Sequence, residues 1–126
     1  MSESFVGDWE GRWAVRRGRE DELTGAERKR FIVSGEIIAL CLRGDGSFCH
    51  KRSIQGTWRQ SANLLKFAPT HVDGHSRKDM EQAALQQGRA FRLDFLFEEF
   101  ALEIDGESLA TPDDRRLLYV RYTRLS

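Results

Sequence analysis

A strict alternation of side chains at the start of the chain constrains its fold more than any other feature. Even positions in this stretch are mainly charged, whereas the odd positions are aromatic, glycine or valine: Phe5, Gly7, Trp9, Gly11, Trp13 and Val15. A period of two is typical of a strand with one buried face and one wet face. A helix would instead scatter the two tryptophans among polar neighbours. Glycines on the buried face let a strand bend sharply, which favours a barrel over a flat sheet.

The same alternation returns later in the chain. We predict strand character over 31–43, 54–58, 65–68, 91–97, 100–104 and 117–125. Residues 16–30 carry many charges and are expected to form an exposed connection with a short helix near 20–23. Ser76 to Gln87 is the best helix candidate, because Ser76 can cap its first turn and Gly88 can end it.

The clearest turn is Gly44-Asp45-Gly46, and its register follows from burial. Burying Phe48 stabilises the fold by roughly 2 kcal/mol, so we expect Phe48 to share the core face with Leu42, opposite it in the hairpin. That register places Cys41 opposite Cys49 on the outer face. A disulfide between them is then geometrically conceivable, but in a reducing compartment both would be free thiols.

These elements predict one domain over residues 1–126. The fold class is all-β with one short helix, in an antiparallel up-and-down β-barrel of about eight strands, because closure leaves no unpaired edge. A two-sheet β-sandwich is the alternative. Apolar residues make up 40% of the chain, and eight Phe with three Trp are enough for a dense core.

Gly7-Asp8-Trp9, on the first long strand, resembles the G-x-W of lipocalin-like (calycin) barrels. The resemblance extends to a second G-x-W at residues 56–58 and to an aromatic-basic closing strand at 118–124. In that family an arginine of the last strand lies over the tryptophan ring. The resemblance therefore implies that Arg121 or Arg124 stacks on Trp9.

The longer motif Gly7-Asp8-Trp9-Glu10-Gly11 also looks like the G-x-W-x-G start of nitrobindin-like haem barrels. Trp13 stands where that motif has a further glycine. Those barrels ligate haem through a histidine late in the chain, and no histidine follows His75 here. Haem is therefore disfavoured, and we predict no cofactor.

Charge and composition exclude several classes of partner. Twenty basic and twenty acidic residues give no net charge, so we expect neither a nucleic acid nor an anionic membrane as partner. No apolar stretch is long enough to span a membrane, and residues 1–10 do not resemble a secretory signal. We expect a cytoplasmic protein.

Few residue groups suggest chemistry. His71, Asp73 and His75 have chelating spacing, but Asp73-Gly74 reads as a turn, so we predict a solvated loop and no metal site. Cys49 and His50 are neighbours on a strand and point to opposite faces, which excludes a nucleophilic pair. Acidic residues between 98 and 107 fit a solvated face. Whether the protein is an enzyme stays open, and a non-catalytic role is the better interpretation.

The aromatic side chains expected to face inward carry the functional prediction: binding of a small apolar or amphipathic molecule inside the barrel. An eight-stranded barrel can be filled by side chains or can hold one such ligand. The predicted ligand-binding residues are Trp13, Phe48, Trp58, Phe91, Phe95, Tyr119 and Arg121, with Arg121 as the anchor for a carboxylate. The alternative is a filled barrel that acts as an interaction or assembly module, a homodimer formed through exposed Leu96, Phe100 or Tyr122.

Overall fold

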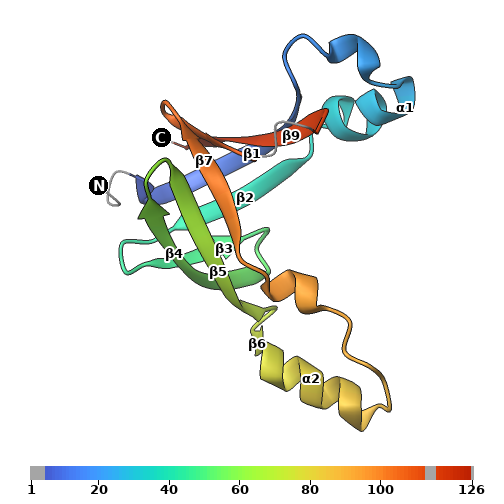
Figure 1. Ribbon diagram of the computed structural model, residues 1–126, viewed down its shortest axis with the longest axis vertical. Helices are drawn as coiled ribbons and strands as arrows, with labels where there is room; N and C mark the ends of the chain where they lie inside the picture. Colours follow the sequence, from blue (N-terminus) through green and yellow to red (C-terminus); the bar gives the residue numbers. More distant parts are fainter. Residues whose placement is uncertain (1–4, 113–115, 126) are drawn as a thin grey trace.

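The computed structural model describes residues 5–112 and 116–125, and this part of the chain contains nine strands and several short helical segments (Figure 1). The strands are β1 (Gly7–Val15), β2 (Ile37–Leu42), β3 (Ser47–His50), β4 (Ile54–Ser61), β5 (Leu64–Val72), β6 (His75–Ser76), β7 (Phe100–Asp105), β8 (Ser108–Ala110) and β9 (Leu118–Arg124). The helical segments are Glu20–Glu22, α1 (Gly25–Glu27) with its continuation Arg28–Val33, α2 (Arg77–Gln86) and Asp94–Phe97.

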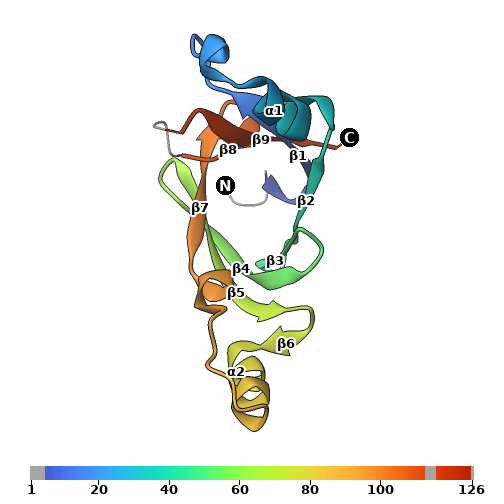
Figure 2. The ribbon, with the colours of Figure 1, turned by 90° about the vertical axis from the view of Figure 1, so that its right-hand side faces the viewer.

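Eight of the strands form a closed antiparallel barrel. β1 pairs with β2 on one side and with β9 on the other, and the β4–β5 and β5–β7 pairings complete the ring. Figure 2 looks into this ring. The additional strand, β6, pairs only with β5 and leads out of the barrel into α2. The predicted fold class is confirmed, and the sandwich alternative is wrong.

The strand registers define the two ends of the barrel. At one end lie residues 5–6 and the turns 43–46, 62–63 and 106–107, because β2–β3, β4–β5 and β7–β8 all reverse there. We call this end the N-terminal mouth. The turn 51–53 between β3 and β4 and the start of β2 lie at the opposite end.

Large apolar side chains fill the interior between these ends. The most deeply buried are Leu40, Leu42, Leu65, Phe67 and Leu109. Gly11 pairs with Tyr122, and a Cβ at Gly11 would lie only 2.6 Å from the Tyr122 ring. The glycine therefore leaves the space in which a second strand's aromatic ring lies across β1.

The first hairpin has the predicted register. Leu42 lies opposite Phe48, and Cys41 lies opposite Cys49. Phe48 is buried, and its ring meets the Phe67 ring edge-on at 5.0 Å between centroids. Both cysteines are free and half-buried.

The prediction of a strand from residue 31 is wrong, because β2 begins only at Ile37. Thr24 and Glu27 form a capping box that starts a helix, and this helix continues to Val33. Phe31 packs from that helix against Trp13, with ring centroids 5.0 Å apart. The apolar side chains of residues 31–33 therefore belong to the end of that helix and those of 38–42 to a strand, so no single strand covers 31–43.

The prediction of a strand at 91–97 is also wrong. Helix α2 begins at the predicted cap, with the Ser76 hydroxyl accepting a hydrogen bond from the Asp79 amide, and the chain then returns through a loop to a helical turn at Asp94–Phe97. We call residues 77–97 the arm. Helix α2 extends away from the barrel and the chain returns beside the end of β5 (Figures 1 and 2), where residues 91–97 form no strand and pair with none.

Candidate functional site

The structure separates the seven predicted ligand-binding residues. Phe48 and Trp58 are buried in the core, and Trp13 packs against the core from the opposite end of the barrel. Phe91 and Phe95 belong to the arm, where Phe95 is 61% exposed. These two phenylalanines therefore do not line the barrel interior, which corrects the predicted inward orientation.

Tyr119 and Arg121 lie on the outer face of β9, which corrects their expected inward orientation. The Arg121 guanidinium forms an ion pair with Asp105 at 2.7 Å and donates a hydrogen bond to the Ser108 hydroxyl. The Arg16 guanidinium lies 4.1 Å from the centre of the Tyr119 ring. Arg121 therefore binds side chains on the outer face of the barrel, and it does not point toward an interior ligand.

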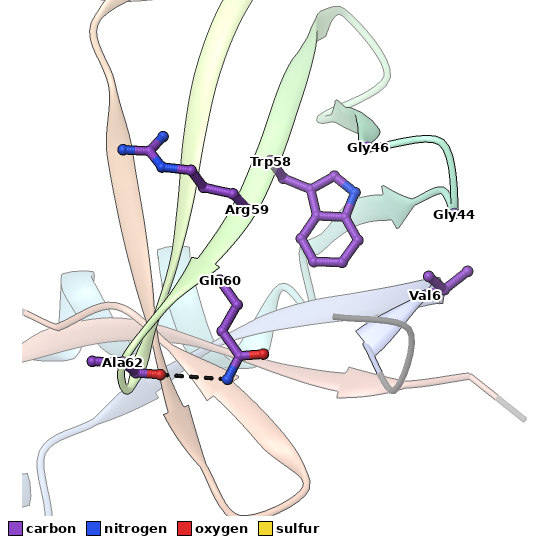
Figure 3. A pocket seen from close by; sticks show the side chains of 7 residues that line it. All are labelled: Val6, Gly44, Gly46, Trp58, Arg59, Gln60 and Ala62. Atoms are coloured by element: carbon purple, nitrogen blue, oxygen red, sulfur yellow. Dashed lines mark hydrogen bonds between the residues drawn. The ribbon is translucent and has the colours of Figure 1, made fainter. Parts of the chain in front are cut away.

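Trp58 forms one wall of a hollow at the N-terminal mouth (Figure 3). The hollow has a volume of about 540 Å³ and is lined by Val6, Gly44, Gly46, Trp58, Arg59, Gln60 and Ala62. The Trp58 indole donates a hydrogen bond to the Arg43 carbonyl at 3.1 Å, and its backbone amide donates to the Gly46 carbonyl at 2.9 Å. In Figure 3 the Trp58 ring is directed toward the side on which Val6 lies, whereas the Arg59 side chain points away.

The β2–β3 turn that holds Trp58 is itself stabilised by its own residues. The Asp45 carboxylate accepts hydrogen bonds from the Ser47 amide and hydroxyl, and these bonds lower the pKa of Asp45. Gly46 has a φ of 88°, a conformation that favours glycine. The Gly-Asp-Gly motif therefore fixes the part of the chain to which the Trp58 ring is anchored.

A second hollow, of about 630 Å³, lies at the same mouth. It is lined by Phe5, Trp9, Gly106, Glu107, Ser108, Thr123 and Arg124. Trp9 is buried, its indole donates a hydrogen bond to the Phe5 carbonyl at 2.9 Å, and the Arg124 guanidinium lies 4.8 Å from the centre of its ring. The lipocalin-like resemblance implied that Arg121 or Arg124 stacks on Trp9, and it is Arg124 that makes this contact.

Phe5 and Val6 separate the two hollows. Phe5 lines one, Val6 lines the other, and both pack partly buried against the core. The hydrogen bond from Trp9 holds this short segment. The hollow beside Trp58 has the polar Gln60 in its lining, and the hollow beside Trp9 has Glu107 and Arg124, so each combines aromatic and aliphatic walls with polar groups. A mouth with this mixture suits a molecule with an apolar body and a polar end.

The buried polar pair in the core is not part of this mouth. His50 is 8% exposed, and its Nε2 lies 2.8 Å from the Tyr122 hydroxyl. Burial, together with the nearby charge of Lys51, lowers the pKa of His50 to about 4, and burial raises the pKa of Tyr122. Both side chains are therefore neutral and satisfy each other within the apolar core.

The other side chains that were considered for metal binding or catalysis do not form a site. His71 and His75 are exposed, and over residues 5–112 and 116–125 no three His, Cys, Asp or Glu side chains are grouped to hold a metal ion. No buried side-chain nitrogen or oxygen in that part of the chain lacks a hydrogen-bond partner. A further group is therefore not needed to satisfy the described core.

Sequence reasoning identified Trp58 but missed most other residues of the mouth. Gln60, Ala62, Gly106 and Arg124 come from separate turns and strand ends, and they become neighbours only when the barrel closes. The available signal was the cluster of glycine-containing turns at 44–46 and 106. Sequence spacing alone did not show that these turns share one end of the molecule.

The described part of the chain thus forms a closed antiparallel β-barrel, and the two hollows at its N-terminal mouth are open to solvent. Comparison with protein-family models, curated proteins and solved structures finds no match. None of the described helices is long and apolar enough to cross a membrane.

Proposed function

We propose that the protein binds a small amphipathic molecule at the N-terminal mouth of its barrel, without catalysing a reaction. The observation that carries this proposal is the pairing of two tryptophan-walled hollows, at Trp58 and at Trp9, on either side of Phe5 and Val6. Their volumes, about 540 and 630 Å³, lie in the range of small-molecule sites.

The packing of the interior supports a site at the mouth over one deep in the barrel. Phe67, Leu65 and Leu109 have no exposed surface. A ligand at their level would have to displace close-packed side chains, which costs several kcal/mol. A ligand at the mouth needs only a shift of Phe5 and Val6, or none if it occupies a single hollow.

The proposal includes a lipocalin-like relationship and a cytoplasmic location. The closed eight-stranded barrel and the Arg124 contact with Trp9 support the relationship. Cys41 and Cys49 face each other across a strand pair, and in a reducing compartment such as the cytoplasm they stay free thiols.

Filling the mouth tests the proposal. Gln60 lines the hollow beside Trp58, so Gln60→Phe should occlude it without adding a tryptophan. We expect the neutral dye N-phenyl-1-naphthylamine, or a medium-chain fatty acid, to bind the natural protein saturably. We expect Gln60→Phe to weaken that binding about tenfold, measured by dye emission and tryptophan fluorescence.

Gln55→Phe is the matched control, because Gln55 is exposed on the same strand and does not line the mouth. It should bind the probes like the natural protein. No saturable binding by any probe, or equal loss in both variants, would refute the mouth as the site.

A second candidate function is self-association through the arm. Leu85 is 77% exposed, Phe95 61% and Leu93 39%. Of the three residues first expected at a dimer interface, Tyr122 is buried and Phe100 stacks on Phe67 with centroids 4.8 Å apart, whereas Leu96 lies in the arm. The exposed apolar side chains of the arm favour this candidate in their place.

A further inference from the structure

The barrel wall has a notch at the end opposite the N-terminal mouth. β3 stops at His50, which pairs with Leu40, so residues Ile37 to Ala39 of β2 have partners on β1 but none on β3. The last contact across this gap is the hydrogen bond from the Lys51 amide to the Ala39 carbonyl, at 2.8 Å. A hollow of about 410 Å³ occupies the notch, lined by Trp13, Glu36, Ile37, Ile38, Ala39, Lys51 and Arg52.

The aromatic wall of the notch is held in place from two sides. The Trp13 indole donates a hydrogen bond to the Glu36 carboxylate at 3.1 Å, and the Phe31 ring meets its edge at 5.0 Å between centroids. Trp13 is only partly buried, so part of its ring surface lines the notch. An orientated indole face of this kind offers a flat apolar surface to a ligand.

The opposite wall carries two adjacent cations. Lys51 and Arg52 are both exposed, and no ion pair joins either to a carboxylate among the residues that the structure describes. Glu36 is the one acidic residue among those that line the notch, and its carboxylate accepts the Trp13 hydrogen bond. The charged groups of the notch therefore sum to one net positive charge, concentrated at the turn.

The turn 51–53 has a backbone conformation that is unfavourable for the residue types it contains. Lys51 has a φ of 56° and Arg52 a φ of 64°, so two consecutive residues with side chains adopt the left-handed conformation. Asparagine and glycine take this conformation at lower cost than lysine and arginine do. Backbone strain of this kind is concentrated at active sites and ligand-binding segments.

From these observations we propose that the notch is a second binding site, which takes a small organic anion with a flat apolar body. The carboxylate, sulfonate or phosphate of the ligand lies against Lys51 and Arg52, and its flat body lies against Trp13. The proposal is independent of the N-terminal mouth, because the two sites share no lining residue.

The turn itself supplies a variant that removes the charges without endangering the fold. Lys51→Asn with Arg52→Gly places the preferred residues at both left-handed positions, so its melting temperature should be no lower than that of the natural protein. Arg17→Gln with Lys78→Gln is the matched control, since both residues are exposed, lie outside the notch and account for the same change in charge.

The test compares the aromatic anion 8-anilinonaphthalene-1-sulfonate with neutral N-phenyl-1-naphthylamine, titrated by dye emission. All variants also carry Gln60→Phe, which weakens binding at the N-terminal mouth, so that the notch contributes a larger share of the sulfonate signal. We expect the turn variant to weaken sulfonate binding at least fivefold, while the charge control binds it normally and the neutral dye is unaffected. Sulfonate binding that falls less than fivefold in the turn variant, or equally in the control, would overturn the proposal.

Discussion

At the scale of single residues, the barrel interior depends on side chains that fit one another across strands. Gly11 contributes by having no side chain, because the Tyr122 ring occupies the space that a Cβ would need. The Tyr122 hydroxyl then reaches His50 on β3. A glycine on one strand thus allows a polar contact between two others, and the buried hydroxyl and imidazole both find partners in an otherwise apolar core.

The buried state of His50 predicts how stability depends on pH. Its pKa in the folded protein is about 4, below the ordinary 6.5, so the unfolded chain binds a proton at a pH where the folded chain does not. The stability contributed by neutral His50 is therefore complete above pH 6.5 and is lost as the pH falls toward 4. Between pH 7 and pH 5 the free energy of unfolding should fall by about 2 kcal/mol from this group.

Urea unfolding at the two pH values measures this loss. His50→Gln, which keeps a hydrogen-bonding group near Tyr122 but does not titrate, should remove most of the pH dependence. His75→Gln should leave it intact, because His75 is exposed. An unchanged pH dependence in His50→Gln would show that another group is responsible.

At the scale of elements, sequence patterns predicted those parts whose partners are near in the chain. The register of the β2–β3 hairpin followed from the need to bury Phe48 opposite Leu42. Helix α2 followed from the Ser76 cap and from helix-forming residues. In both cases the decisive interactions lie within about a dozen residues, so a local pattern was enough.

The arm shows where such patterns fail. Residues 91–97 alternate like a strand, yet a strand also needs a neighbour, and the alternation does not say whether one is present. Here the segment returns from α2, with Phe91 near Phe97 and the Arg77 guanidinium paired with the Asp94 carboxylate. Phe91 and Phe95, which were predicted to face the interior, lie outside the barrel for this reason.

The exposed side chains of the arm give a prediction at this scale. If the arm mediates self-association, light scattering should show a dimer at high protein concentration, and Phe95→Ser should shift the equilibrium toward monomer. The barrel should keep its stability in this variant, because Phe95 is mostly exposed. A strict monomer in the natural protein would exclude this function for the arm.

At the scale of the whole molecule, closure of the barrel assembles the N-terminal mouth. β1 and β9 come from the two ends of the chain, and their pairing brings Arg124 to Trp9. The succession of hairpins in the sequence predicted that the sheet closes. It did not predict which turns share an end, and it therefore could not assemble the N-terminal mouth from Phe5, Trp58 and residues 106–108.

The indole N–H groups of the three tryptophans offer the most direct test of the proposed mouth. Each has its own hydrogen-bond acceptor: Phe5 for Trp9, Arg43 for Trp58 and Glu36 for Trp13. In a ¹H–¹⁵N NMR titration with neutral N-phenyl-1-naphthylamine, we predict that the indole signals of Trp58 and Trp9 shift saturably while that of Trp13 stays in place. Shifts confined to Trp13, or the absence of any shift at saturating dye, would contradict binding at the N-terminal mouth.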